Sequence, residues 1–341
     1  MKASDLLRLR ELLEDYIISL SLDKEIIKMS DYLKIISNSI DIDVEHKSNI
    51  NKFVDNYQQI FDNFINLKSN IELEITNITN LVDQKGYDIN MSNLDHLFNH
   101  FINGEVRETF VTPEINHIVK SSILKYVDWH YPVLQFGCRF NNLLPRKPKE
   151  SYKSLGQRLN DPDLFMEFED SMTGGEPFYV CDFNQESMNR CIEKFNPVFQ
   201  SKICDYVIED ADFSNLPQGQ FGLIFSWNLF NYATPDILTK YLEQLVKLLR
   251  PGGTLIFNYN NCDLPASMMM SEVQRESYMP KRHLIDLVTK FNLELINSYD
   301  ITNEADLIYP YSKISWVEIK KPGILKTCKA HSSLGKISVE L

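Results

Sequence analysis

The sequence has little glycine, and its glycines are unevenly placed. Of 12 glycines in 341 residues, only Gly86 and Gly104 lie among the first 130. Long apolar runs are absent too: none reaches the roughly 18–20 residues that a bilayer-spanning helix needs, so we expect no integral membrane protein. The first 20 residues carry charges among their leucines, which is typical of an amphipathic helix and not of a signal peptide.

Cysteine pairs and basic residues are also scarce. The six cysteines form no CxxC pair and no zinc-type cluster, which predicts reduced thiols in a cytoplasm-like compartment. Acidic residues outnumber basic ones by 47 to 35, giving a net charge of −12. Residues 313–341 are the exception, because they carry a net positive charge, with six lysines and two glutamates. Because duplex binding requires a basic field, a nucleic-acid partner is disfavoured.

The glycine-poor first part of the chain is predicted to be helical. Apolar residues recur there at spacings of three and four: Ile50, Phe53, Tyr57, Ile60, Phe64, Leu67 and Ile71, followed by Ile78 and Leu81. Such a seam faces a partner helix. Two arrangements are open, an intermolecular coiled coil or a hairpin in which residues 1–40 cover the seam. Either makes residues 1–88 a region for homo-oligomerisation or for docking to a partner.

Residues 89–130 are expected to form a helical connector without a metal site. His96 and His100 are four residues apart, so a helix would place both on one face. No Glu or Cys stands at ligand spacing beside them, in contrast to zinc motifs of the HExxH type. We therefore interpret them as two surface histidines and expect no metal.

After residue 131 short apolar runs alternate with helical patterns. Five runs are candidate strands, namely 132–136, 177–181, 205–209, 222–226 and 254–258. Their alternation with helices predicts a parallel α/β sheet that is covered on both faces. Two later runs, 293–299 and 314–320, would complete seven strands, with a helix at 281–291 before them.

The stretch from Leu248 to Ile256, LLRPGGTLI, resembles the helix–turn–strand signature of class I S-adenosylmethionine-dependent methyltransferases. Pro251 would end the helix, and the two glycines after it allow the turn. The likeness continues upstream through IEDAD, NLP and QFGLIFS between residues 208 and 226, and it covers about residues 131–320. It implies a Rossmann-like seven-stranded methyltransferase sheet, here preceded by an all-helical region, with S-adenosylmethionine as cofactor.

In such a sheet the ligand lies across the carboxyl ends of the strands. The resemblance implies that Asp182 accepts both ribose hydroxyls. Further cofactor contacts would come from Gly137, Asp210, the backbone of Ala211 and Ser226, with the Asp210–Ala211 pair at the adenine. Substrate contacts would come from Asn228 and Tyr232, and the candidates for catalysis are Tyr232 and His283. Each has a structural alternative, as a turn carboxylate, a core aromatic or a helix-start histidine.

The first glycine motif departs from the family. Where the family has an acidic residue and a Gly-x-Gly-x-Gly turn, this chain has Gln135, Gly137, Arg139 and Asn141. Glycine matters there because the backbone passes close to the cofactor. The interval from Gly137 to Asp182 is 45 residues, which predicts an insertion at about residues 145–176.

Two functions agree with these patterns. One is an S-adenosylmethionine-dependent methyltransferase for a small-molecule or protein acceptor, oligomerised through its N-terminal helices. The alternative is a catalytically impaired methyltransferase fold that serves as an assembly component. Residues 314–323 and the motif at 329–331 are similar to the C-terminal stretch of methyltransferase-like proteins of tailed bacteriophages. That similarity implies phage structural proteins as partners and the host cytoplasm or the virion as location. Residues 321–341 are expected to be a basic tail.

Overall fold

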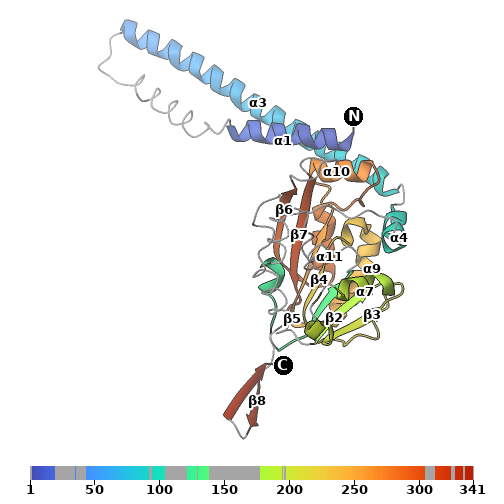
Figure 1. Cartoon of the computed structure of the whole chain (residues 1–341). Helices are drawn as coiled ribbons and strands as arrows, with labels where there is room; N and C mark the ends of the chain where they lie inside the picture. Colours follow the sequence, from blue (N-terminus) through green and yellow to red (C-terminus); the bar gives the residue numbers. More distant parts are fainter. Residues whose placement is uncertain are drawn as a thin grey trace, which may run out of the picture. The chain divides into compact units, whose positions relative to one another are not determined.

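The chain folds into two compact units, Met1–Asp88 and Ile89–Leu341 (Figure 1). The computed structural model describes residues 2–19, 35, 44–91, 94–103, 121–128, 130–137, 177–193, 195, 197–303, 312–323, 327–332 and 335–340. The insertion expected at about 145–176, Arg139 and Asn141 lie outside the described residues.

The described part of the first unit is helical, as its low glycine content predicts. It contains α1 (Ala3–Ser19) and the 48-residue α3 (Val44–Met91). The burial of the apolar seam of α3 differs along the helix. Ile71 and Ile78 are buried, whereas Phe53 and Ile60 are 59% and 66% exposed. The helical prediction is therefore confirmed, and the coiled coil remains a prediction.

The second unit contains a seven-stranded sheet in the order β3-β2-β1-β4-β5-β7-β6. All seven strands lie near their predicted positions: β1 (Val133–Phe136), β2 (Phe178–Asp182), β3 (Ile203–Val207), β4 (Phe221–Ser226), β5 (Leu249–Tyr259), β6 (Glu294–Asn303) and β7 (Ser312–Lys320). The predicted parallel order holds for β1–β5, but β7 runs antiparallel to both β5 and β6. Only residues 304–311 separate β6 from β7, which is too few for the crossover that parallel strands require.

Helices connect the strands, and local signals set where several of them begin. The helices are α4 (Asp95–Asn103), α7 (Gln185–Ile192), α8 (Pro197–Gln200), α9 (Pro235–Leu248), α10 (Pro265–Glu272) and α11 (Lys281–Lys290), with a 3₁₀ turn η3 (Phe230–Tyr232). The side chain of Asn184 accepts a hydrogen bond from the amide of Ser187 and caps α7. Thr234 caps α9 in the same way, and Pro235 suits its first turn.

Each face of the sheet is covered by a different helix. On one face, Val133, Val180 and Phe225 form a buried cluster with Met188 and Cys191 of α7. On the other, Phe136 of β1 stacks on Tyr241 of α9, with ring centroids 5.6 Å apart and planes 26° apart. Covering on both faces explains why the central strands are apolar along their whole length.

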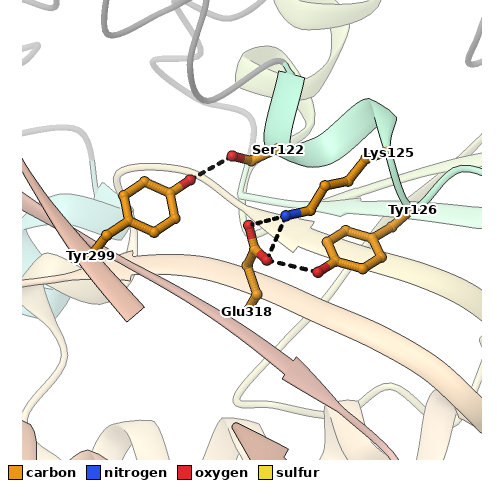
Figure 2. A network of polar contacts seen from close by, with 5 residues as sticks. All are labelled: Ser122, Lys125, Tyr126, Tyr299 and Glu318. Carbon is orange, nitrogen blue, oxygen red and sulfur yellow. Dashed lines mark hydrogen bonds and ion pairs between the residues drawn. The ribbon is translucent and has the colours of Figure 1, made fainter. Parts of the chain in front are cut away.

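A buried polar network attaches residues 121–126 to the sheet (Figure 2). Glu318 of β7 is fully buried, and its carboxylate accepts hydrogen bonds from Lys125 Nζ at 2.8 and 3.0 Å and from the Tyr126 hydroxyl at 2.7 Å. Beside it, the Ser122 and Tyr299 hydroxyl oxygens lie 2.5 Å apart. A buried carboxylate without such partners would be strongly destabilising, so the network fixes this segment against β6 and β7.

The end of the chain, which the sequence predicts to be a basic tail, contains secondary structure. Residues 321–341 include an antiparallel hairpin of β8 (Thr327–Ser332) and β9 (Gly335–Glu340). Among the described residues, no helix combines the length and apolar character needed to cross a membrane.

Candidate functional site

The carboxyl ends of β1, β2 and β4 bring three of the predicted residues to one edge of the sheet. The amide of Gly137 donates to the Cys181 carbonyl at 2.8 Å, directly before Asp182. Ser226 ends β4 in register with Phe136, the residue before Gly137. The strand order reverses between β1 and β4, and ligands of open α/β sheets bind beside such a switch point.

Gly137 occupies a position that favours glycine. Its φ is +75°, a left-handed conformation that other residues adopt at a cost. A Cβ added there would lie 2.8 Å from Cδ2 of Leu229, in the loop that follows β4. The one glycine retained from the family motif is therefore favoured by its positive φ and by the close approach of Leu229.

Asp182 is buried and takes part in the turn from β2 into α7. Its Oδ1 accepts hydrogen bonds from the amides of Phe183 at 2.7 Å and Asn184 at 3.2 Å. A carboxylate has about four acceptor positions, so these two bonds do not exhaust its capacity. Asp182 therefore acts as a turn carboxylate, the structural alternative. This role does not preclude binding of ribose hydroxyls by the same carboxylate.

Asp210 and Ala211 lie beyond β3, and Lys240 of α9 contacts Asp210. They have φ values of +45° and +60°. The Asp210 carboxylate pairs with Lys240, with the Asp210 side chain 88% exposed. Ala211 is buried. The Asp210 carboxylate, which the resemblance places at an adenine, therefore has a protein partner on α9.

Tyr241 lies within an aromatic cluster at this edge. Its ring contacts those of Phe98, Phe136, Phe183, Phe213 and Phe230, with centroids 5.4–6.3 Å apart. Burial is the main cause that raises the pKa of Tyr241, and the negative charge of Asp210 adds to it. The hydroxyl is therefore protonated at neutral pH.

Two buried polar side chains at the ends of β1 and β4 have no hydrogen-bond partner within the described part of the chain. They are Ser226, through its Oγ, and Gln135, through both atoms of its amide. Unpaired buried polar atoms are rare because each costs free energy. The Ser226 hydroxyl is thus available to a ligand at the carboxyl edge. Gln135 stands where the resemblance implies an acidic residue.

The loop after β4 is held by three buried asparagines in a closed ring. The Asn228 amide donates to Asn258 Oδ1 at 2.6 Å, and Asn258 Nδ2 donates to Asn231 Oδ1 at 2.6 Å. Asn231 Nδ2 completes the ring at Asn228 Oδ1, 3.2 Å away, and also reaches Glu276 Oε1 at 3.3 Å. Sequence reasoning found Asn228 but missed Asn231 and Asn258. The available signal was amide side chains at the end of an apolar strand, where burial requires partners.

The two candidates for catalysis lie on separate elements. Tyr232 ends η3 and is buried. His283 lies in the first turn of α11, where its backbone amide donates to the Pro280 carbonyl at 3.0 Å. Both positions are consistent with the structural alternatives, a core aromatic for Tyr232 and a helix-start histidine for His283.

The described residues contain no group of three or more His, Cys, Asp or Glu side chains that would hold a metal ion. His96 and His100 of α4 pack edge to face, with ring centroids 5.7 Å apart.

A family model of a methyltransferase domain matches residues 168–257. This part of the chain resembles a methyltransferase. The match contains β2–β4 and most of β5, together with Asp182, Asp210, Ala211 and Ser226. A curated relative, "Probable thiol methyltransferase 2" of Arabidopsis thaliana, is 31% identical over 75 residues. That alignment covers 22% of this chain, and this chain spans only about a third (33%) of the relative's length.

Solved methyltransferase structures show a weaker likeness. The geranyl diphosphate C-methyltransferase of Streptomyces coelicolor is 7% identical, with a TM-score of 0.44 over 61% of this chain and 80% of its own. The N-methyltransferase NodS of Bradyrhizobium japonicum is 13% identical, with a TM-score of 0.41 over 61% and 87%.

Proposed function

We propose that this chain is an S-adenosylmethionine-dependent methyltransferase whose acceptor is a small molecule or a protein. The observation that carries the proposal is the edge formed by Gly137, Asp182 and Ser226, at the switch point of a seven-stranded sheet. The methyltransferase-domain match covers Asp182 and Ser226 and supports it independently.

The residues at this edge fit the cofactor in part. Asp182 offers a carboxylate for ribose hydroxyls, and the unpaired Ser226 hydroxyl is a buried polar group for a ligand to satisfy. Gly137 keeps its backbone close to the loop after β4. Gln135 departs from the pattern, because it supplies a neutral amide in place of a carboxylate.

S-adenosylmethionine supplies a methyl group that its sulfonium already activates, so transfer depends chiefly on positioning the acceptor in line. The asparagine ring would hold the loop around Asn228 and Tyr232 in one conformation beside that position. An acceptor that loses a proton on methylation would need a base, for which His283 is the candidate.

Calorimetric titration with S-adenosylmethionine and S-adenosylhomocysteine tests the proposal. We expect micromolar binding, equivalent to about −8 kcal/mol. Adenosine and homocysteine, titrated separately, serve as controls for the two ends of the ligand. No heat and no thermal shift at millimolar ligand would overturn the proposal.

That negative result would favour the alternative, a methyltransferase fold that serves assembly. Two observations favour this alternative: the neutral Gln135, and the pairing of Asp210 with Lys240 of α9. Partnership with phage structural proteins, and a location in the host cytoplasm or the virion, stay predictions from sequence similarity alone.

We further propose that the first unit oligomerises through α3. Phe53 and Ile60 are one heptad apart, and each exposes more than half of its side chain. Burying such side chains against a second copy would contribute about 1.5–3 kcal/mol each.

A further inference from the structure

The side-chain amide of Gln135 is buried at the candidate site without a hydrogen-bond partner. Gln135 is 1% exposed, and neither its Oε1 nor its Nε2 makes a hydrogen bond within the described part of the chain. Burying an amide in this way is costly, because its donor and its acceptor both lose their water. Gln135 therefore has the properties of a group whose partner is a ligand.

The sheet places Gln135 beside Asp182. Gln135 of β1 is in register with Val180 of β2 and Phe225 of β4, and the last two belong to the cluster on the face that α7 covers. Since side chains alternate along a strand, Asp182, two residues after Val180, lies on the same face. Gln135 is one residue before the end of β1. Gln135 and Asp182 thus lie on neighbouring strands, on one face, at the carboxyl edge of the sheet.

The strand order indicates which part of the cofactor Gln135 would meet. The proposed function assigns Asp182 on β2 to the ribose and the loop after β4 to the acceptor, and β1 lies between these two strands. The part of S-adenosylmethionine that continues from the ribose toward the acceptor carries the sulfonium and the amino-acid arm. Gln135 on β1 would therefore meet the arm, which ends in a carboxylate and an ammonium group.

An amide and a carboxylate at residue 135 would treat that arm differently. Asp182 already contributes one negative charge to this face, and a second carboxylate beside it would repel the carboxylate of the arm. The Nε2 group of Gln135 can instead donate a hydrogen bond to the carboxylate, and Oε1 can accept one from the ammonium. The neutral amide thus accommodates an arm of either charge.

We propose that Gln135 binds the carboxylate of the arm through Nε2, so that the site also accepts adenosine thioethers whose arm is anionic and lacks the ammonium group. This specificity rests on the proposed function for the identity of the nucleoside. It adds one class of ligand to S-adenosylmethionine and S-adenosylhomocysteine. The cost of burying the unpaired amide in the free protein is offset when such a ligand binds.

Two ligands that share the adenosine thioether isolate the contribution of the arm. One is 5′-methylthioadenosine, which has no arm. The other, 5′-(3-carboxypropyl)thioadenosine, carries a carboxylate and no ammonium and is called the anionic ligand below. In calorimetric titration we expect the wild type to bind the anionic ligand about tenfold more tightly, the effect of a hydrogen bond to a charged group. Equal binding of the two ligands would overturn the specificity.

Substitutions of Gln135 should change the preference between the two ligands. Gln135→Met removes the donor, and we expect equal affinity for both. Gln135→Glu adds a second negative charge beside the arm, so the anionic ligand should bind more weakly than 5′-methylthioadenosine. Gln200→Glu is the matched control, because Gln200 lies on α8 before the amino end of β3, where its Nε2 donates to the Phe195 carbonyl at 2.7 Å. We expect this control to keep the wild-type preference. The same preference in both variants of Gln135 would exclude Gln135 as its cause.

A measurement on the wild type keeps the test valid if the variants of Gln135 fail to fold. With isotope-labelled glutamine, the saturating anionic ligand should shift the side-chain amide resonances of Gln135 more than those of Gln200. It should also shift them more than 5′-methylthioadenosine does. Bound anionic ligand with an unshifted Gln135 signal would contradict the specificity.

The binding outcomes separate this specificity from the proposed function. Binding of 5′-methylthioadenosine or S-adenosylhomocysteine, without a preference for the anionic ligand, overturns the specificity and leaves the methyltransferase proposal intact. Tighter binding of the anionic ligand by the wild type, lost in Gln135→Met, supports both. Binding of none of these nucleosides overturns both.

Discussion

At the scale of single residues, the carboxylate of Asp182 serves a turn and, on our proposal, a ligand. Asp182→Asn keeps an oxygen for the amides of Phe183 and Asn184 but removes the charge. We expect it to weaken S-adenosylhomocysteine binding by about 1–3 kcal/mol, the effect of a lost charge-assisted hydrogen bond. Asp205→Asn on β3, also calorimetrically titrated, is the control for charge. Unaltered affinity in Asp182→Asn would remove Asp182 from the site.

For Gln135 we expect that a substitution increases the stability of the fold. Its amide is buried without a hydrogen-bond partner among the described residues, next to the apolar cluster around Val133. Gln135→Met has a similar volume and no polar group to bury. We expect it to raise the free energy of unfolding by about 1 kcal/mol, measured by urea denaturation. A loss of stability would indicate instead that the amide has a partner that the mutation removes.

At the scale of elements, the network around Glu318 links residues 121–126 to the edge of the sheet (Figure 2). Lys125→Met keeps the aliphatic stem and removes both hydrogen bonds from the ammonium group to the buried carboxylate. We expect a loss of about 1.5–3 kcal/mol in the free energy of unfolding. Lys247→Met is the control, because Lys247 pairs with Glu243 on the exposed surface of α9 and should cost under about 0.5 kcal/mol. Equal losses of stability in the two variants would mean that the pair of Lys125 and Glu318 adds nothing to the stability of the fold.

The same network predicts a response to alkaline pH. Burial raises the pKa of Tyr126, and so does the hydrogen bond that its hydroxyl donates to Glu318. A pKa raised in the folded state gives stability that is complete below the unfolded value, about 10, and is lost as pH rises further. We expect the free energy of unfolding to fall above pH 10, with a shallower slope in Tyr126→Phe. Urea denaturation at pH 8, 10 and 11 measures this, and parallel slopes would contradict it.

The local sequence pattern predicts most helices and strands. The two differ in the spacing of their apolar residues and in the residues that mark their ends. The seven strands and α11 were found in this way, and β3 begins only two residues before its predicted start. Strand direction is not a local property. The antiparallel β7 depends on the short connection from β6, which the pattern of each strand alone does not contain.

The resemblance to a family indicates only those candidate residues that lie in a recognisable motif. It implies Gly137 and Asp182 as cofactor contacts, and the structure places both at the carboxyl edge of the sheet. Tyr241 was missed because it belongs to the apolar stripe of α9, where a tyrosine looks like core. Only the fold brings its ring against Phe136 and Phe183 at the candidate site.

At the scale of the whole molecule, our proposals assign association to the first unit and chemistry to the second. The candidate site lies entirely in the second unit, and the described part of the first consists of helices with exposed apolar side chains. Changes to the seam of α3 should therefore alter assembly and leave the affinity for S-adenosylhomocysteine unchanged. Affinity that falls with assembly would indicate that neighbouring copies complete the site.

Placing charge in the seam tests that assembly. Carboxylates at an interface between apolar residues would be buried without partners, so Ile60→Asp with Phe64→Asp should lower the mass measured by light scattering. Gln59→Asp with Asn63→Asp adds the same charge to exposed polar positions of the same turns and should leave the mass unchanged. A monomer mass for the wild type and both variants would exclude the intermolecular coiled coil. The hairpin, in which residues 1–40 cover the seam, would then be the remaining arrangement.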